Sequence, residues 1–368
     1  MSAPTTCRGE HCEPDWKIMI NEKIKSLIED LKQGNKLLLQ DFIYILENYN
    51  NDDFNYIKDI AQKIAIEKFG KKIYFRGIIE FSNICKNDCI YCGIRRSNNN
   101  VDRYRLTKDE ILECCQEGYE FGYRTFVLQS GEDGHFTDEV MVDVVKSIRE
   151  KYPDCAITLS IGERSRDSYQ KLFDAGANRF LLRHEAANKE LYEKIHPAVQ
   201  KWEERFRCLR DLRDIGYQVG AGMMVGVPNQ TLENLAEDLV FMQDFRPHMV
   251  GIGPFIPHKD TPYRDEKAGS VEISLLCLSL VRIMLPNVLL PSTTALGSLG
   301  GDGRQQGVLH GCNVVMPNLS PMIVRKKYLL YDNKAGVNLD AKTSIETLRK
   351  QMEDIGYEVV VTRGDFRE

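Results

Sequence analysis

The stretch Cys85-Lys-Asn-Asp-Cys89-Ile-Tyr-Cys92 places three thiols on one short loop, directly after an apolar segment. Iron–sulfur cubanes are normally held by four thiolates, and structural zinc sites also close with four ligands. Three thiols at C-x3-C-x2-C spacing therefore leave one iron of a cubane free to bind a reactant. Zinc is the alternative, but it needs a fourth ligand. The next histidine is the distant His135, and the chain has no second C-x-x-C pair.

The length and composition favour a globular enzyme built on one α/β barrel. The chain has 368 residues, of which 42% are hydrophobic and 28% charged, and its net charge is −5. An α/β barrel needs about 250 residues, which leaves room for extensions at both ends. The acidic balance argues against nucleic acid as a partner. There is no apolar run of membrane-spanning length and no secretory leader, so we expect a cytoplasmic protein without a membrane partner.

The remaining cysteines are expected to be free thiols. The chain is long and its eleven cysteines are an odd number, which indicates a reducing compartment rather than a disulfide framework. Cys7, His11 and Cys12 could bind a metal adventitiously, but a frayed tail is the favoured interpretation. Buried cysteine behaves as a small hydrophobe. That interpretation applies to the cysteines in helical patterns: Cys114, Cys115, Cys208 and Cys277.

Four units are predicted along the chain. Apolar residues recur at helical spacing in three segments near the N-terminus, residues 16–31, 39–48 and 54–69. We expect a flexible tail over residues 1–15, an N-terminal helical cap over 16–72, a barrel over 73–318 and a C-terminal extension that closes the barrel over 319–368.

Strands and helices alternate through the central part of the chain. The first strand, Ile73–Asn83, ends at the cysteine loop, and Thr107 begins the next helix with Glu110 completing a capping box. Such alternation predicts a parallel sheet, here a (β/α)8 barrel of the TIM type, with the active site at the carboxyl ends of the strands. The other strands are predicted at Thr125–Ser130, Ala156–Ile161, Arg179–Arg183, Tyr217–Val225, Met249–Gly253, Val288–Pro291 and Asn313–Met316.

Charged residues at alternate strand positions indicate a polar lumen. Side chains alternate between the two faces of a strand. The charges therefore face the barrel interior rather than the helical layer, where they would be buried without partners. Mutually satisfied core salt bridges are the alternative. The residues concerned are Arg76, Glu80 and Ser82 on the first strand and Arg179, Arg183 and Glu185 on the fourth.

The cysteine triad, with Tyr91 just before its last member, resembles the signature of the radical S-adenosylmethionine (SAM) superfamily. The resemblance implies that Cys85, Cys89 and Cys92 hold a [4Fe–4S] cluster whose free iron is chelated by the amino and carboxylate groups of SAM. One-electron reduction then cleaves SAM to methionine and a 5′-deoxyadenosyl radical. Cofactors of this kind carry the chemistry, and the protein binds and orients them.

A SAM cradle is predicted beside the cluster. Ser130-Gly-Glu-Asp133 ends the second strand and resembles the superfamily's Gly-Gly-Glu segment, with Ser130 in place of the first glycine. A carboxylate can pair with the SAM ammonium, and a guanidinium can fork onto its carboxylate. Arg205 is the candidate arginine for binding the SAM carboxylate. The alternative is that Arg205 is a solvent-exposed helix residue without a role in binding. The predicted cofactor-binding residues are Tyr91, Gly131, Glu132, Asp133, Ser160, Glu163, Glu185 and Arg205.

From about Ile73 to Tyr331 the chain also resembles the [FeFe]-hydrogenase maturase family HydE. The resemblance is carried by Ile79-Glu-Phe-Ser-Asn83, Val127-Leu-Gln-Ser-Gly-Glu-Asp133, Leu182-Arg-His-Glu185, Met249-Val-Gly-Ile-Gly-Pro-Phe-Ile-Pro-His258, Pro291-Ser-Thr-Thr-Ala295 and Asn313-Val-Val-Met-Pro-Asn318. It implies a substrate cavity lined by Gln129, Ser130, Thr158, Arg183, Thr293, Thr294 and Tyr328.

Two departures from relatives narrow the chemistry. Some HydE members carry a second, surface cluster on cysteines after the last strand, but no cysteine follows Tyr331 here, so we expect one [4Fe–4S] cluster. Sulfur-inserting relatives such as biotin synthase place cysteines on barrel strands. Here the corresponding strand ends are Gln129, Ser160 and Gly222, and sulfur donation from a sacrificial cluster is not expected.

The expected function is that of a radical SAM maturase. The radical would act on a small sulfur- or iron-containing substrate, and the product would feed the di-iron subcluster of [FeFe] hydrogenase. Expected partners are other hydrogenase maturation proteins and an electron donor, under anaerobic conditions. One alternative is an amino-acid mutase resembling methylornithine synthase, which would need charged groups on the late strands. The other is an iron–sulfur scaffold without catalysis.

Overall fold

The computed structural model describes residues 19–367, and the structural statements below refer to that part of the chain. The predicted flexible tail of residues 1–15, with Cys7, His11 and Cys12, lies outside it.

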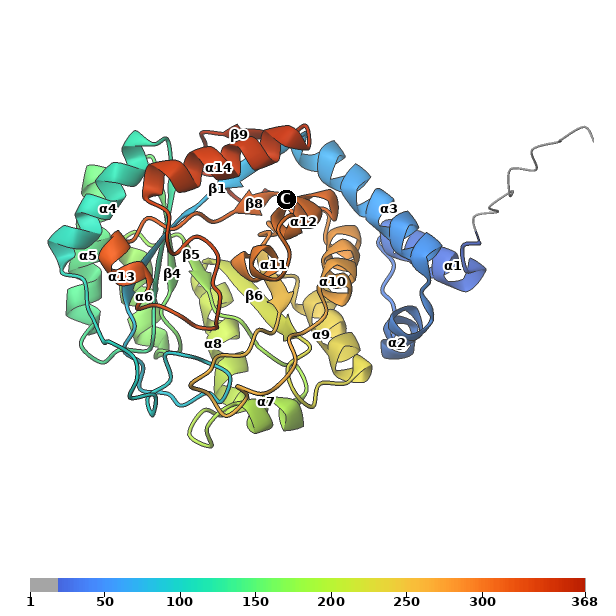
Figure 1. Ribbon diagram of the computed structural model, residues 1–368, viewed down its shortest axis with the longest axis horizontal. Helices are drawn as coiled ribbons and strands as arrows, with labels where there is room; N and C mark the ends of the chain where they lie inside the picture. The colour runs from blue at the N-terminus through green and yellow to red at the C-terminus, as the bar shows by residue number, and fades with distance from the viewer. Residues whose placement is uncertain (1–18, 368) are drawn as a thin grey trace, which may run out of the picture.

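Six parallel strands form the main sheet, and each is hydrogen-bonded to the next in chain order. A second sheet has the order β8-β1-β9. Isolated parallel bridges from Met249 to Leu289, from Pro291 to Val314 and from Ile78 to Asn318 complete the ring, which confirms the TIM-type barrel (Figure 1). The main strands are β2 (Gly77–Ser82), β3 (Thr125–Ser130), β4 (Ala156–Ser160), β5 (Arg179–Leu181), β6 (Gln218–Val225) and β7 (Met249–Pro254). The second sheet comprises β1 (Lys72–Phe75), β8 (Val314–Val315) and β9 (Glu358–Val360).

Three strand predictions need correction. The predicted strand Ile73–Asn83 is two strands, β1 and β2, interrupted at Arg76. The predicted strand Val288–Pro291 makes only two single bridges. In this segment the Leu290 amide bonds the Asn313 side chain at 2.9 Å, and proline has no amide hydrogen to donate to a ladder. β9 lies in the C-terminal extension, where no strand was predicted.

Helices cover the outside of the sheet. Thr107 caps α4 by accepting from the Glu110 amide, and the Glu110 carboxylate accepts from the Thr107 amide, so the predicted capping box is confirmed. The covering helices are α4 (Lys108–Glu120), α5 (Asp138–Lys151), α6 (Arg166–Asp174), α8 (Trp202–Ile215), α9 (Leu232–Phe245) and α10 (Val271–Met284). Shorter helices are α7 (Lys189–Ile195), α11 (Thr294–Leu299), α12 (Gly303–Leu309) and α13 (Met322–Arg325).

The N-terminal helices lie along one flank of the barrel (Figure 1). They are α1 (Glu22–Lys32), α2 (Leu39–Asn48) and α3 (Asn51–Phe69). α2 packs on α9 and α3 packs on α10, and their apolar faces form one core with those helices. The barrel helix α10 is consequently buried along almost its whole length, although helices on a barrel surface usually keep a polar outer face.

The C-terminal segment closes the amino-terminal end of the barrel. After α14 (Ala341–Asp354) and β9, residues 363–365 lie at the amino-terminal ends of the barrel strands. There the fully buried Arg179 donates to Arg363 O at 2.8 Å and to Asp365 Oδ1 at 2.6 Å, and Arg76 donates to Gly364 O at 3.3 Å. Arg76 and Arg179 are therefore structural, and the salt-bridge alternative is correct for Arg179.

This closure predicts a large cost for removing Arg179. Arg179→Met leaves the partners of a buried cation unsatisfied, and breaking a buried ion pair costs about 3 kcal/mol or more. We expect the urea midpoint, followed by circular dichroism, to fall accordingly. Arg210→Met, which replaces an exposed arginine of α8, is the control and should leave the midpoint unchanged. Equal midpoints for the two variants would contradict the structural role.

The ion pair between Arg179 and Asp365 also predicts that the fold loses stability at low pH. Burial raises the pKa of Asp365, but the ion pairs with Arg179 and Arg363 outweigh burial and hold that pKa below the usual 3.8. A carboxyl with a lowered folded-state pKa stabilises the fold at neutral pH, and this contribution is lost as the pH falls through that pKa. Asp365→Asn should therefore lose stability at pH 7 and depend less steeply on pH below about 4.

Candidate active site

A cavity of about 340 Å³ opens at the carboxyl ends of the strands. It is lined by the ends of β2 to β7, by the cysteine loop and by residues 328–334 of the C-terminal extension. Most residues predicted from the sequence line it together: Cys85, Cys89, Tyr91, Cys92, Gln129, Ser130, Gly131, Glu132, Ser160, Arg183, Glu185, Arg205, Thr293, Thr294 and Tyr328. Their common location is observed, and their individual roles stay predictions.

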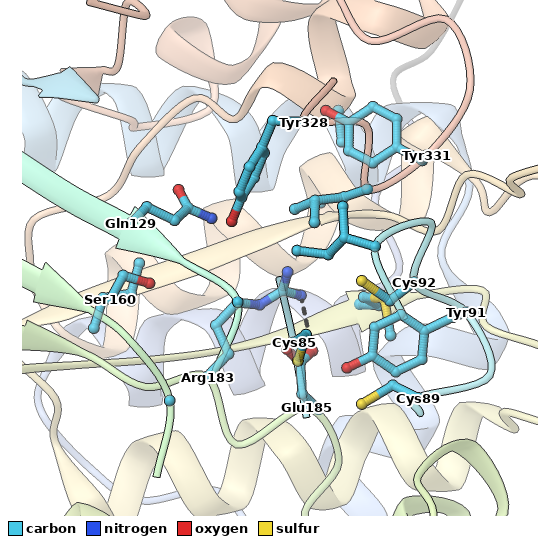
Figure 2. Close-up of a pocket in the computed structure, with 18 of the residues that line it drawn as sticks. Cys85, Cys89, Tyr91, Cys92, Gln129, Ser160, Arg183, Glu185, Tyr328 and Tyr331 are labelled. Carbon is cyan, nitrogen blue, oxygen red and sulfur yellow. Dashed lines mark ion pairs between the residues drawn. The ribbon is translucent and has the colours of Figure 1, made fainter. Parts of the chain in front are cut away.

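The cysteine loop follows β2 and is held by its own polar contacts. Cys85, Cys89 and Cys92 are free thiols on one wall of the cavity (Figure 2). The Arg103 guanidinium donates to four loop carbonyls at 2.6–3.0 Å, and Arg95 pairs with Asp88 at 2.7 Å. These contacts fix the loop through protein atoms alone. Within residues 19–367 no group of three His, Cys, Asp or Glu side chains has the arrangement of a single-ion site.

Burial raises the pKa of all three thiols. It is the largest cause that raises the pKa of Cys85 and Cys89, and it raises the pKa of Cys92 to about 12. Because iron binds the thiolate, cluster insertion must release protons from this loop.

Glycine lets the second strand end lie against the cysteine loop. A Cβ on Gly131 would lie 2.3 Å from Ile84 O and 2.8 Å from Cys85 Cβ. The Glu132 amide also donates to Cys85 Sγ at 3.4 Å. The predicted segment Ser130–Asp133 therefore contacts the cysteine loop through its backbone, as a cofactor cradle requires.

The cavity lining also carries polar atoms that make no hydrogen bond. Arg183 Nη2 lies 3.3 Å from Glu185 Oε2, and this ion pair points into the cavity (Figure 2). Neither atom makes a hydrogen bond of good geometry, nor does Thr293 Oγ1. Buried polar groups nearly always have partners in native proteins. A ligand with both an ammonium and a carboxylate would supply them, and SAM is such a ligand.

Glu185 is held in an unusual backbone conformation. Its φ is +66°, and its amide donates to Gly222 O at 3.0 Å. The neighbouring His184 is fully buried, accepts from the Gly222 amide at 3.2 Å and pairs with Asp238 at 3.1 Å. Left-handed backbone at a non-glycine residue is uncommon and gathers at functional sites. These contacts aim the Glu185 carboxylate into the cavity.

Arg205 is a buried member of the site, so its alternative as a solvated helix residue is wrong. Only 6% of Arg205 is exposed. Its guanidinium donates to Glu163 Oε1 and to Arg183 O, each at 2.6 Å. Glu163, predicted to bind the cofactor directly, does not line the cavity and instead holds Arg205.

Two further predicted residues lie off the cavity wall. Asp133 accepts from Arg105 at 2.7 and 2.9 Å and from Ser82 Oγ at 2.7 Å, so its carboxylate fixes the end of β2. Thr158 is buried within β4, and its hydroxyl has no hydrogen-bond partner. The family resemblance placed both residues at the site but did not reveal which way their side chains point.

Tyr91 is fixed by a histidine that the sequence did not reveal. His196 Nδ1 lies 2.9 Å from Tyr192 O, and because a carbonyl only accepts, this nitrogen carries the hydrogen. Nε2 then accepts from the Tyr91 hydroxyl at 3.2 Å. Burial, with the nearby Arg205 charge, lowers the pKa of His196 to about 3, so the ring is neutral. No spacing motif links the two residues.

A lysine from outside the barrel strands enters the cavity. Lys334 forms an ion pair with Glu80 and donates to Tyr328 O at 2.9 Å, and both charged side chains are less than one-tenth exposed. Asn318 donates to the second Glu80 oxygen at 2.8 Å. Glu80 was predicted to face the lumen. Lys334 was not predicted, because it lies in an irregular loop.

Residues 79–242 match the Radical SAM superfamily. The chain is 44% identical over 297 residues to the [FeFe] hydrogenase maturase subunit HydE of Thermotoga maritima, an alignment that covers 81% of this chain and 84% of that protein. It is 27% identical over 344 residues to the 3-methylornithine synthase of Methanosarcina acetivorans, with 93% and 96% covered. Among solved structures, methylornithine synthase superposes with a TM-score of 0.78 at 26% identity, covering 91% of this chain and 97% of that one.

These comparisons support the fold predicted from the strand pattern. The barrel is of the TIM type found in radical SAM proteins. In the described part of the chain no helix has both the length and the apolar character needed to cross a bilayer.

Proposed function

Since the chain belongs to the HydE family of the radical SAM superfamily, we propose that it is a radical SAM enzyme that acts in maturation of the di-iron site of [FeFe] hydrogenase. The observation that carries the proposal is the cavity itself. Its lining combines the three thiols with Arg183 and Glu185, whose Nη2 and Oε2 atoms lie 3.3 Å apart but make no hydrogen bond of good geometry. A scaffold that only delivers iron would have no use for these two charged residues.

The cavity fits a [4Fe–4S] cluster and SAM. Cys85, Cys89 and Cys92 would hold the cluster, which when bound supplies the electron that cleaves SAM to methionine and the 5′-deoxyadenosyl radical. Glu185 and Arg205 would bind the charged groups of SAM. Uncharged contacts to SAM would come from Tyr91, Ser160 and the backbone of Gly131 and Glu132.

The deeper part of the cavity would hold the substrate. Gln129 and Tyr328 point toward one another there, from β3 and from the C-terminal extension (Figure 2). Thr293 and Thr294 offer hydroxyl groups, and Arg183 offers a cation. This mixture suits a small sulfur- or iron-containing molecule that carries negative charge. Other hydrogenase maturation proteins and an electron donor would be its partners.

The mutase alternative requires ligands for a free amino acid. An α-amino acid needs a carboxylate and a cation placed for its two charges. The late part of the barrel lines the cavity with Gly253 of β7 and with Thr293 and Thr294 at the start of α11. These residues are uncharged. The lumen also contains the ion pair of Glu80 with Lys334, in which the two charges neutralise one another.

The test is the substrate dependence of SAM cleavage. Reduced protein is incubated with SAM and either lysine, a small thiol or an iron–cysteine complex, and 5′-deoxyadenosine and adenosylated products are quantified by mass spectrometry. We expect lysine to leave the rate unchanged and the thiolate-bearing compounds to raise it. Lysine-dependent turnover to a rearranged amino acid would reject the maturase and favour the mutase.

A further inference from the structure

Two smaller cavities continue sideways from the main one. A neck of about 20 Å³ shares Glu80, Thr294 and Lys334 with the main cavity. An outer chamber of about 160 Å³, which we call the vestibule, shares Arg304 and Gly336 with the neck. Exposed residues on the far side of the vestibule, among them Gly301 and Thr347, show that it opens to the surface.

The vestibule is lined by residues of α12, of α14 and of the loop that carries Ala335 and Gly336, and none of the three loop cysteines lines it. Gln305 of α12 donates to Gln351 O of α14 at 3.2 Å, which joins the two helices. On the inner side the Ala335 amide donates to Ser298 Oγ of α11 at 2.9 Å. The loop that carries Lys334 thus forms the partition between the lumen and the vestibule.

Arg304 lines both the neck and the vestibule, yet its guanidinium has no hydrogen bond or ion pair with any of residues 19–367. Two other inward-facing arginines, Arg282 and Arg103, are held by backbone and amide oxygens, whereas Arg183 in the main cavity also keeps donors without partners. Arg282 donates three hydrogen bonds and Arg103 four. A guanidinium has five N–H donors in a planar fork that suits anions.

The surroundings of Arg304 favour an anionic ligand. Burial is the largest cause that lowers the pKa of Arg304, and the nearby Tyr331 phenol raises it in part. Gly297 lies beside its side chain, and a Cβ there would come within 3.1 Å of Arg304 Cγ, so glycine leaves the chain its room. Near the neck stands a second cation, Lys334.

We propose that Arg304 is the recognition group of a second ligand site, a lateral site for a small anion in the vestibule. The neck joins this site to the lumen beside the Glu80–Lys334 ion pair. A cavity of the neck's size holds about one water molecule, so the ion pair closes the passage to anything larger while it is intact. The site stands independently of the proposed function.

The ligand is a small carboxylate or an inorganic anion, and bromide and acetate are the probes that separate the two. Crystals of the full-length protein are soaked in bromide, and anomalous scattering locates the ion. We expect a peak beside Arg304 in the wild type and in the control Arg210→Gln, but none in Arg304→Gln. Calorimetric titration with acetate and with bromide should show binding at least about tenfold weaker in Arg304→Gln. An empty vestibule in the wild type, or a peak that survives in Arg304→Gln, would overturn the site.

A second variant tests the connection to the lumen. Glu80→Gln keeps the shape of the side chain but removes the counter-ion of Lys334. A second bromide peak should then appear in the neck beside Lys334 Nζ. If the vestibule is occupied but the neck of this variant stays empty, the two cavities are not joined in the way proposed.

Discussion

Cys89→Ala is expected to abolish both the iron–sulfur cluster and SAM cleavage. The anaerobically reconstituted wild type should hold about four iron atoms per chain, because three thiolates can anchor one cubane. In the variant, two thiols remain on the loop, and neither Gln200, which Cys89 contacts at 3.0 Å, nor another nearby side chain replaces the lost ligand. Iron content and 5′-deoxyadenosine formation are the measurements.

Cys114→Ala is the matched control. Cys114 is a buried thiol of α4 outside the cavity lining, so its loss should leave iron and SAM cleavage intact. A Cys89→Ala protein that kept the cubane spectrum would show that the triad is wrongly assigned. A wild type that took up about eight iron atoms would show a second cluster, against the absence of cysteines after Tyr331.

Arg205→Gln is expected to weaken SAM binding by about ten- to a hundredfold, the range of one charge-assisted hydrogen bond. Arg205 is almost fully buried, and its contacts to Glu163 and to Arg183 O leave part of the guanidinium free toward the cavity. The variant should also lose stability, because Glu163 is left without its partner. Equilibrium dialysis of the cluster-loaded protein against labelled SAM measures the affinity.

Arg207→Gln provides the comparison for Arg205. It removes the same charge from the same helix, but Arg207 pairs with Glu204 and Asp211 toward solvent. SAM affinity should be unchanged in this variant. Equal affinity in Arg205→Gln and the wild type would return Arg205 to a purely structural role. Arg205→Lys keeps the positive charge but not the planar guanidinium. Its affinity for SAM should lie between those of the wild type and Arg205→Gln.

The helices and strands of the barrel could be predicted because each depends on residues that are close together in the sequence. The capping box of Thr107 and Glu110 depends on neighbours in the same turn. The cysteine loop, Gly131 and Glu185 could be placed at strand ends because parallel strands all end on one face. These residues converge on the cavity as expected.

Side-chain partners from distant segments could not be predicted. Arg76 and Arg179 were predicted to face the lumen, and the alternation of strand residues could not reveal that the C-terminal segment contacts both of them. Lys334 and His196 reach the site from irregular segments with no periodic pattern. Asp133 and Arg205 could be placed near the site but not oriented, because orientation depends on Arg105 and Glu163.

The central claim is that three cysteines hold a cluster whose remaining iron binds SAM within this cavity. The most direct measurement is electron–nuclear double resonance of the reduced, cluster-loaded protein with SAM labelled at the amino nitrogen and at the carboxylate oxygens. Hyperfine coupling from both labels is the predicted result, because both groups would lie on the free iron. A reduced cluster whose spectrum shows coupling to neither label would contradict the account.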